Sequence, residues 1–246
     1  MNAPFRGVSL EDKYRQLGGY VDLAGIQALV RLPLDQIRRD RSGGFNTGGY
    51  SPGYRGSPLA GYDQQLAQAG TFLQSHNIVF QPGVNEDLAA TAVWGTQKVG
   101  LHAGARVQGV FGLWYGKAPG VDRSGDVLRH ANMSGTAPLG GVLAVAGDDH
   151  LAKSSSLPSH SELAFADWEI PVLAPADIQN VLDYGLIGIA LSRYAGVWAA
   201  LIANSETMNA SAIVRVDPER LRIVLPADHP DPRRGRDLNR LPLLQY

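Results

Sequence analysis

The sequence predicts a doubly wound α/β fold, in which helices cover both faces of a mainly parallel sheet. Short apolar runs of strand type alternate along the chain with segments of helical length, which is the pattern of βαβ units. The clearest strand, at residues 141–146, is an uninterrupted apolar run and indicates burial on both faces. Turns rich in glycine or polar residues follow several of these runs, and ligands of such sheets bind beyond the carboxyl ends of the strands.

Each element follows from its local pattern. Apolar runs predict strands within or over residues 45–59, 77–80, 107–115, 141–146, 170–173 and 197–202. Periodic segments predict helices over most of the first forty residues, from residue 62, from residue 86, over 126–134 and over 176–194. Residues 116–122 and 147–161 are predicted as loops, and the charged residues 38–41 as a solvated connector.

Three parts of the chain are expected. Residues 1–42 form an N-terminal helical segment, residues 43–216 form the α/β domain, and residues 217–246 form a linker-like tail rich in proline, aspartate and arginine. A tail of this composition is typical of a connection between domains. The chain is therefore expected to be a fragment of a larger enzyme.

Composition excludes several classes of function. With 22 basic and 23 acidic residues the formal net charge is -1, which predicts neither a nucleic-acid nor a membrane partner. The chain has no cysteine, so it cannot itself carry a thiolate nucleophile or ligate an iron–sulfur cluster through cysteine. No apolar stretch reads as a membrane span or a signal peptide, and a cytoplasmic protein is expected.

Glu86 is the most informative candidate for a functional residue. It follows a short apolar run and begins a predicted helix, which Asn85 can cap through its side-chain oxygen. Ala89 and Ala90 give this helix a face of small side chains, which a second backbone or a flat ligand can approach closely. On spacing alone, the favoured interpretation is that Glu86 only complements the positive end of the helix dipole.

Two polar segments are further candidates. Residues 117–126 combine glycine, proline and four charges, and they are either a solvated loop or an ordered loop that clasps a polar ligand. Asp148, Asp149 and His150 follow the clearest strand, but three adjacent residues cannot all converge on one ion. Their segment is therefore predicted to cap the next helix or to hydrogen-bond a ligand, and no metal site is predicted.

Other common motifs are missing. Residues 112–118 are one spacer too short for a phosphate loop and have alanine where a magnesium ligand is required. No G-x-G-x-x-G fingerprint opens a helix, and no serine lies in a G-x-S-x-G elbow. The sequence thus favours neither a nucleoside triphosphatase, nor a nicotinamide enzyme, nor a hydrolase.

Six motifs resemble, in order, those of indolepyruvate ferredoxin oxidoreductase, a member of the 2-oxoacid:ferredoxin oxidoreductases. The motifs lie at residues 53–59, 85–95, 114–126, 130–132, 147–150 and 161–167. The resemblance runs from about residue 14 to about residue 213 and is to the N-terminal part of the long fused bacterial form. It implies the pyrimidine-binding domain of a thiamine diphosphate enzyme.

The resemblance implies roles for particular residues. In that family a glutamate at the position of Glu86 contacts the aminopyrimidine ring and promotes activation of the cofactor. Residues that would line the cofactor or substrate cleft are Tyr54, Arg55, Gly56, Ser57, Pro58, Asn85, Lys117, Arg123, Asp148, Asp149 and His150. The Gly-Asp-Gly motif that holds the diphosphate and Mg²⁺ in such enzymes is missing from this chain, so a further domain is expected to supply it.

The resemblance also implies a reaction and partners. The parent enzyme converts a 2-oxoacid and CoA into acyl-CoA and CO₂, and passes electrons through iron–sulfur clusters to ferredoxin. This chain would need the remaining domains or subunits, would form a dimer, and would be inactive alone. The alternative is a non-catalytic, stand-alone α/β module for assembly or small-ligand binding, in which Glu86 is only a carboxylate at a helix start.

Overall fold

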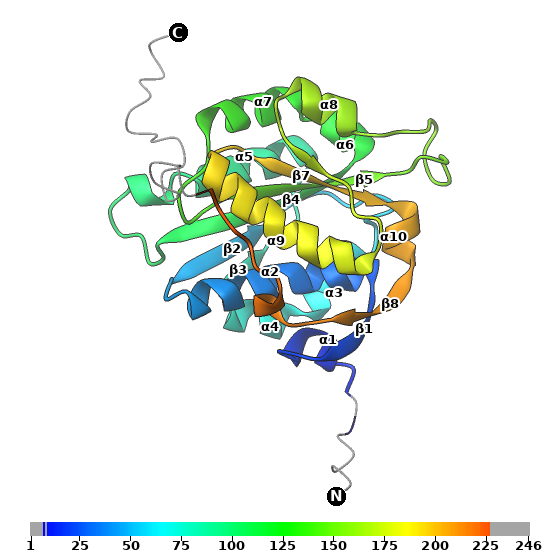
Figure 1. Cartoon of the computed structure of the whole chain (residues 1–246). Coiled ribbons are helices and arrows are strands. Elements are labelled where there is room, and N and C mark those ends of the chain that lie inside the picture. The colour runs from blue at the N-terminus through cyan, green and yellow to red at the C-terminus, as the bar shows by residue number, and fades with distance from the viewer. Residues whose placement is uncertain (1–6, 8, 227–246) are drawn as a thin grey trace, which may run out of the picture.

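Six parallel strands form the central sheet of the protein, whose computed structural model describes residues 7 and 9–226 (Figure 1). The strands follow the order β3-β2-β4-β5-β7-β6, and every neighbouring pair is parallel. Their bounds are β2 (Thr47–Ser51), β3 (Ile78–Phe80), β4 (Gly109–Lys117), β5 (Val142–Asp148), β6 (Val172–Leu173) and β7 (Ala199–Asn204). Parallel neighbours require crossover connections, and helices supply them here.

Helices cover both faces of this sheet, as Figure 1 shows. One layer consists of α2 (Gly25–Ser42), α3 (Tyr62–Gln68), α4 (Gly70–Ser75) and α9 (Ile178–Ala195). The other consists of α5 (Glu86–Thr96), α6 (Ala118–Arg123), α7 (Gly125–Ser134) and α8 (Glu162–Asp167). Alternate residues of β5 feed the two cores: Leu143 and Val145 face one layer, and Ala144 and Ala146 the other. The predicted doubly wound fold is confirmed.

Most predicted elements are present within a few residues of their expected positions. The runs at 77–80, 107–115, 141–146, 170–173 and 197–202 correspond to β3, β4, β5, β6 and β7. Helix α9 spans most of the predicted 176–194 segment, and α7 begins one residue before the predicted 126–134 helix. The spacing of apolar residues and the turn residues on either side were enough to predict these strands and helices.

The expectation that the first forty residues are mostly helical is wrong at β1 (Tyr20–Ala24). Only α1 (Asp12–Arg15) precedes this strand, which pairs antiparallel with β8 (Ser211–Arg215) near the other end of the described chain. In the two-stranded ribbon that β1 and β8 form, Val21 and Leu23 are buried, whereas Tyr20 and Asp22 are exposed. The strand depends on a partner far away in sequence, which local pattern does not reveal.

The expectation of a loop at residues 116–122 is also wrong. Residues Ala118–Arg123 form α6, and Gly125 begins α7 almost at once. Pro119 lies in the first turn of α6, where a missing N–H costs nothing. Two short helices, α8 and α10 (Ser205–Asn209), had no prediction, and single 3₁₀ turns lie at Val99–Leu101 and Pro218–Arg220.

The charged residues 38–41 are not merely a solvated connector, because Asp40 is 4% exposed. Arg193 of α9 binds both carboxylate oxygens of Asp40, at 2.7 and 2.8 Å. The Oγ1 of Thr47 and the Nε2 of Gln36 donate further hydrogen bonds to Asp40, at 2.6 and 2.8 Å. One carboxylate therefore ties α2, α9 and the start of β2 together.

The predicted tail, residues 217–246, lies mostly outside the described residues. In its described part, Arg39 donates from Nη1 to the carbonyl of Leu221 at 3.1 Å, and Leu221 and Ile223 pack against the core. The three-part division of the chain stays a prediction. Among the described residues, no helix is long and apolar enough to cross a bilayer.

Asp40→Asn is expected to reduce the free energy of unfolding by about 3 kcal/mol, because it removes the charge that matches Arg193, whose side chain is largely buried. The matched control is Glu11→Gln, which breaks an ion pair with Arg15 whose side chains are 53% and 63% exposed. That change should cost no more than about 1 kcal/mol. Urea unfolding of both variants measures the difference, and equal costs would contradict the role given to Asp40.

Candidate functional site at the carboxyl edge of the sheet

The carboxyl edge brings the loops after β2, β3 and β4 into contact. The backbone of Gly53 forms a bridge with Tyr115 of β4, and the N–H of Tyr54 donates to the Tyr115 carbonyl at 3.0 Å. The N–H of Gly83 donates to the carbonyl of Gly53 at 2.8 Å. A Cβ atom at position 53 would collide with Tyr115, so glycine is required for this approach.

Glu86 is the first residue of α5 and lies over this edge. As predicted, Asn85 caps the helix: its Oδ1 accepts from the N–H of Leu88 at 2.9 Å. The indole Nε1 of Trp114 donates to the backbone carbonyl of Glu86 at 3.0 Å. The side chain of Glu86 rests on Gly116 and Gly120, where a Cβ atom at position 120 would collide with the carboxylate. Two glycines thus form the niche that holds the side chain.

The carboxylate of Glu86 has no hydrogen-bond donor within the part of the chain that the structure describes. The residue is only 8% exposed, and the cation that approaches it, Nη1 of Arg123, is 4.0 Å from Oε2. Both carboxylate oxygens keep some solvent-accessible surface, because neither is among the fully buried side-chain atoms of the described residues that lack a hydrogen-bond partner. The arrangement can accept a hydrogen bond or a proton from a ligand that enters the niche.

Arg123 and Ser124 bind the neighbouring carboxylate of Asp87. The Nε of Arg123 is 3.2 Å from Oδ1 of Asp87, and Oγ of Ser124 donates to the same oxygen at 3.1 Å. Sequence reasoning named Arg123 but missed Asp87 and Ser124. The acidic pair at the helix start was a signal for Asp87, whereas nothing local indicated that Ser124 would meet it.

The loop residues after β2 divide into exposed and packed positions. Tyr54 is 40% exposed and Arg55 is exposed, whereas Ser57 is half-buried and Pro58 is buried beside Gly147. Gly56 lies against the side chain of Lys117. The Nζ of Lys117 donates to the carbonyl of Ser154 at 2.8 Å, so this cation connects the end of β4 to the loop after β5.

Asp148 and Asp149 organise the loop after β5. Asp148 accepts from the N–H and the Oγ of Ser161, the residue that precedes α8, both at 2.7 Å. Asp149 accepts from the N–H groups of Lys153 and Ser154 at 3.1 and 2.8 Å. The segment was predicted to cap the next helix or to hydrogen-bond a ligand; Asp148 binds Ser161, the N-cap residue of α8, but no described side chain caps the helix itself, and the ligand alternative stays a prediction. Burial raises the pKa of Asp148, whereas the backbone N–H of Ser154 lowers the pKa of Asp149.

Within the described part of the chain, one group of three potential metal ligands converges. Single ligand atoms of Asp148, His150 and Glu162 lie within 4.8 Å of one another. Glu162 comes from α8 and was not considered together with the other two in sequence. Both oxygens of Asp148 already bind Ser161, so the innermost ligand of this group is engaged in holding the loop.

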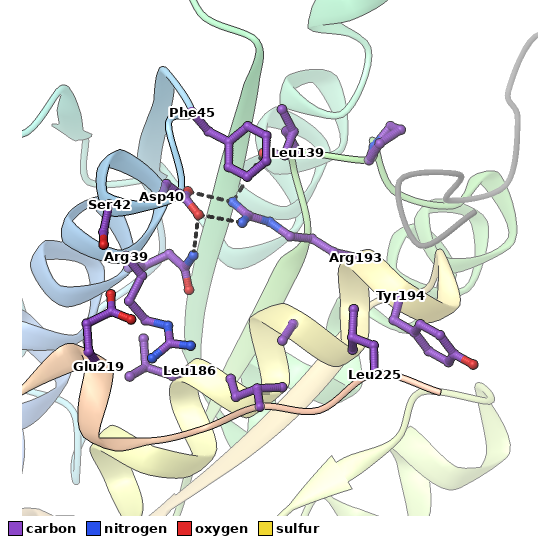
Figure 2. Close-up of a pocket in the computed structure, with 15 residues that line it drawn as sticks. Arg39, Asp40, Ser42, Phe45, Leu139, Leu186, Arg193, Tyr194, Glu219 and Leu225 are labelled. Atoms are coloured by element: carbon purple, nitrogen blue, oxygen red, sulfur yellow. Dashed lines mark hydrogen bonds and ion pairs between the residues drawn. The ribbon is translucent and has the colours of Figure 1, made fainter. Parts of the chain in front are cut away.

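A hollow of about 500 Å³ lies elsewhere, near the amino ends of β2 and β5. Figure 2 shows Asp40 and Arg193 facing each other in its wall, with Phe45 and Leu139 close by (Figure 2). None of the predicted site residues lines it. The candidate site is therefore assigned to the carboxyl edge, where ligands of parallel sheets bind.

The architecture and the edge define the class: a doubly wound α/β domain with a polar carboxyl edge. The structure is similar to that of a 2-oxoglutarate:ferredoxin oxidoreductase from Magnetococcus marinus, solved with 2-oxoglutarate, coenzyme A and succinyl-CoA bound. The TM-score is 0.60 at 18% sequence identity, over 83% of this chain and 33% of that chain. This chain thus shares the fold and spans about a third of its neighbour's length. No family model and no curated protein matches the sequence.

Gly120→Ala is expected to displace the carboxylate of Glu86 and to reduce the free energy of unfolding by about 1–3 kcal/mol, the usual cost of overpacking. Gly95→Ala is the control, because position 95 lies in α5 with no atom within 4 Å of an added Cβ. That change should stabilise the protein by about 0.5–1 kcal/mol. Thermal or urea unfolding measures both, and a neutral Gly120→Ala would contradict the tight niche.

Asp148 is expected to make stability depend on pH. Because its pKa is raised in the folded protein, its contribution is complete below the ordinary value of 3.8 and is lost as the pH rises through the raised pKa. The measurement is the difference in unfolding free energy between the wild type and Asp148→Asn, from about pH 4 to about pH 7. The wild type should lose unfolding free energy relative to Asp148→Asn as the pH rises. A gain with rising pH would refute the raised pKa of Asp148.

Proposed function

We propose that this chain is the pyrimidine-binding half of a thiamine diphosphate-dependent aryl 2-oxoacid:ferredoxin oxidoreductase, with indolepyruvate as the substrate. The observation that carries the proposal is the carboxylate of Glu86, a residue that is only 8% exposed and whose oxygens accept no hydrogen bond from the described residues. It lies at a helix start on the carboxyl edge, where the resemblance to indolepyruvate ferredoxin oxidoreductase implies a glutamate that contacts the cofactor's aminopyrimidine ring. The shared fold of a 2-oxoglutarate:ferredoxin oxidoreductase supports the same family of reactions.

The residues at this edge fit a planar heteroaromatic ring. Gly116 and Gly120 keep the niche around Glu86 free of side-chain bulk, and Glu86 would exchange a proton or share a hydrogen bond with a ring nitrogen. Thiamine diphosphate, when bound, supplies the electron sink for decarboxylation of the 2-oxoacid. Exposed Tyr54 offers a ring for stacking, and Arg55 is a cation for an anionic group of substrate or CoA.

The edge also fits a site completed by other domains or subunits. Large apolar side chains are exposed in the segments that follow the strands here: Val84 at 81%, Leu88 at 55%, Leu151 at 68%, Leu157 at 73% and Leu163 at 73%. We propose that these side chains contact a covering domain or subunit, since singly exposed apolar residues are in themselves ordinary. That covering part would hold the diphosphate and Mg²⁺, and further parts would hold the iron–sulfur clusters that reduce ferredoxin in a dimeric, cytoplasmic enzyme.

Glu86→Gln in the complete enzyme is expected to reduce turnover by about 10²–10⁴, because the amide cannot exchange a proton with the ring. The free energy of unfolding should change by no more than about 1 kcal/mol, because volume and hydrogen-bonding capacity are kept. The measurement is viologen reduction that depends on CoA and an aryl 2-oxoacid. The control is Glu206→Gln, because Glu206 is also a first-turn glutamate behind a capping asparagine, Asn204, and it is exposed.

Wild-type turnover in Glu86→Gln would return Glu86 to a helix-start role and favour a non-catalytic module. The chain by itself should show no turnover and should bind thiamine diphosphate weakly in calorimetry with Mg²⁺ present. Submicromolar binding by the chain alone would contradict the half-site.

A further inference from the structure

Arg123 lies next to Glu86 but makes no hydrogen bond to its carboxylate. Its Nη1 is 4.0 Å from Oε2 of Glu86, which is beyond hydrogen-bond range. Its Nε instead meets Oδ1 of Asp87 at 3.2 Å. Arg123 thus favours the more exposed of two adjacent carboxylates and leaves the buried one without a donor.

Asp87 is held in place independently of Arg123. The Oγ of Ser124, a residue that is 1% exposed, donates to Oδ1 of Asp87 at 3.1 Å. Ser124 lies at the junction of α6 and α7, directly after Arg123. The junction therefore delivers a buried hydroxyl and a guanidinium to the same oxygen of Asp87.

Asp87 controls which carboxylate receives the guanidinium. An arginine presents a rigid fork of N–H donors that pairs readily with both oxygens of a carboxylate. Among the described residues, the carboxylates within 4.0 Å of Arg123 are those of Asp87 and Glu86. If Asp87 lost its charge, Arg123 would turn to Glu86, occupy its oxygens and close the niche to a ligand.

We propose that Asp87 is a positioning residue, which retains Arg123 and thereby keeps the carboxylate of Glu86 available to a hydrogen-bond donor of the bound ligand. The inference rests on the proposed function for the nature of that ligand, a protonated or N–H-bearing heteroaromatic ring. The relation among Asp87, Arg123 and Glu86 is a property of the chain itself and can be measured without any cofactor.

The test is the carboxyl-carbon NMR signal of Glu86 in the ¹³C-glutamate-labelled chain, assigned through its loss in Glu86→Gln. Asp87→Asn should move this signal in the wild-type background, because Arg123 then pairs with Glu86. The same substitution in an Arg123→Gln background should produce no comparable change. Asp122→Asn is the control, because Asp122 is exposed, adjacent to Arg123 and not among the carboxylates within 4.0 Å of it.

A second variant, Asp87→Glu, tests whether loss of the fold explains the change in the Glu86 signal. Asp87→Glu keeps the charge and should leave the Glu86 signal close to its wild-type position, with an unchanged melting temperature. Equal effects of Asp87→Asn in the two backgrounds, or no effect in either, would overturn the proposal. So would an Asp87→Glu variant that behaves like Asp87→Asn.

Activity of the complete enzyme gives a second readout. Asp87→Asn should lower kcat by roughly fivefold, the scale of a partly exposed ion pair, and Arg123→Gln introduced with it should remove that dependence on Asp87. If Asp87→Asn moves the Glu86 signal only when Arg123 is present, but Glu86→Gln retains full turnover, the proposed function fails and the positioning role stands. If Glu86→Gln is inactive but Asp87→Asn shifts the Glu86 signal equally with and without Arg123, only the positioning role fails.

Discussion

The close backbone contact between Gly53 and Tyr115 is the constraint on which the carboxyl edge depends. It extends the pairing of β2 with β4 beyond the regular strands, and Gly83 then bonds to the Gly53 carbonyl from the loop after β3. The loops after β2 and β3 are thereby fixed to β4 and to each other by main-chain hydrogen bonds, which do not depend on side-chain rotamers. Glu86 begins its helix three residues after Gly83, so its location follows from this backbone frame.

Local signals were sufficient for the sheet and for the start of α5, because apolar runs, turn residues and a capping asparagine act over a few residues. They failed where the determining partner is distant in sequence. Asp40 is buried because Arg193 meets it across the packed α2 and α9 helices, and a run of charges gave no hint of this. Helix α6 was missed because glycine, proline and charge predict a loop, while its packing against α5 and β4 decides the outcome.

The candidate site was predictable in position but less so in its contacts. Glu86 and the segments that surround it were identified from motif order and from the rule that ligands bind at carboxyl strand ends. Asp87, Ser124 and the niche glycines were not, because each acts through atoms of another element. The role of Lys117 as a ligand cation stays a prediction, and its hydrogen bond to the carbonyl of Ser154 is a contact that the sequence did not indicate.

The ribbon of β1 and β8 has a consequence for how the chain folds. Its register pairs Tyr20 with Arg215, so β1 cannot find its partner until β8, the last strand of the described residues, has been synthesised. Contacts of such long sequence separation form late and slow folding, because a large loop must close first. Until then Val21 and Leu23, which are buried in the folded protein, lack the strand that pairs with them and stay exposed to solvent or to other chains.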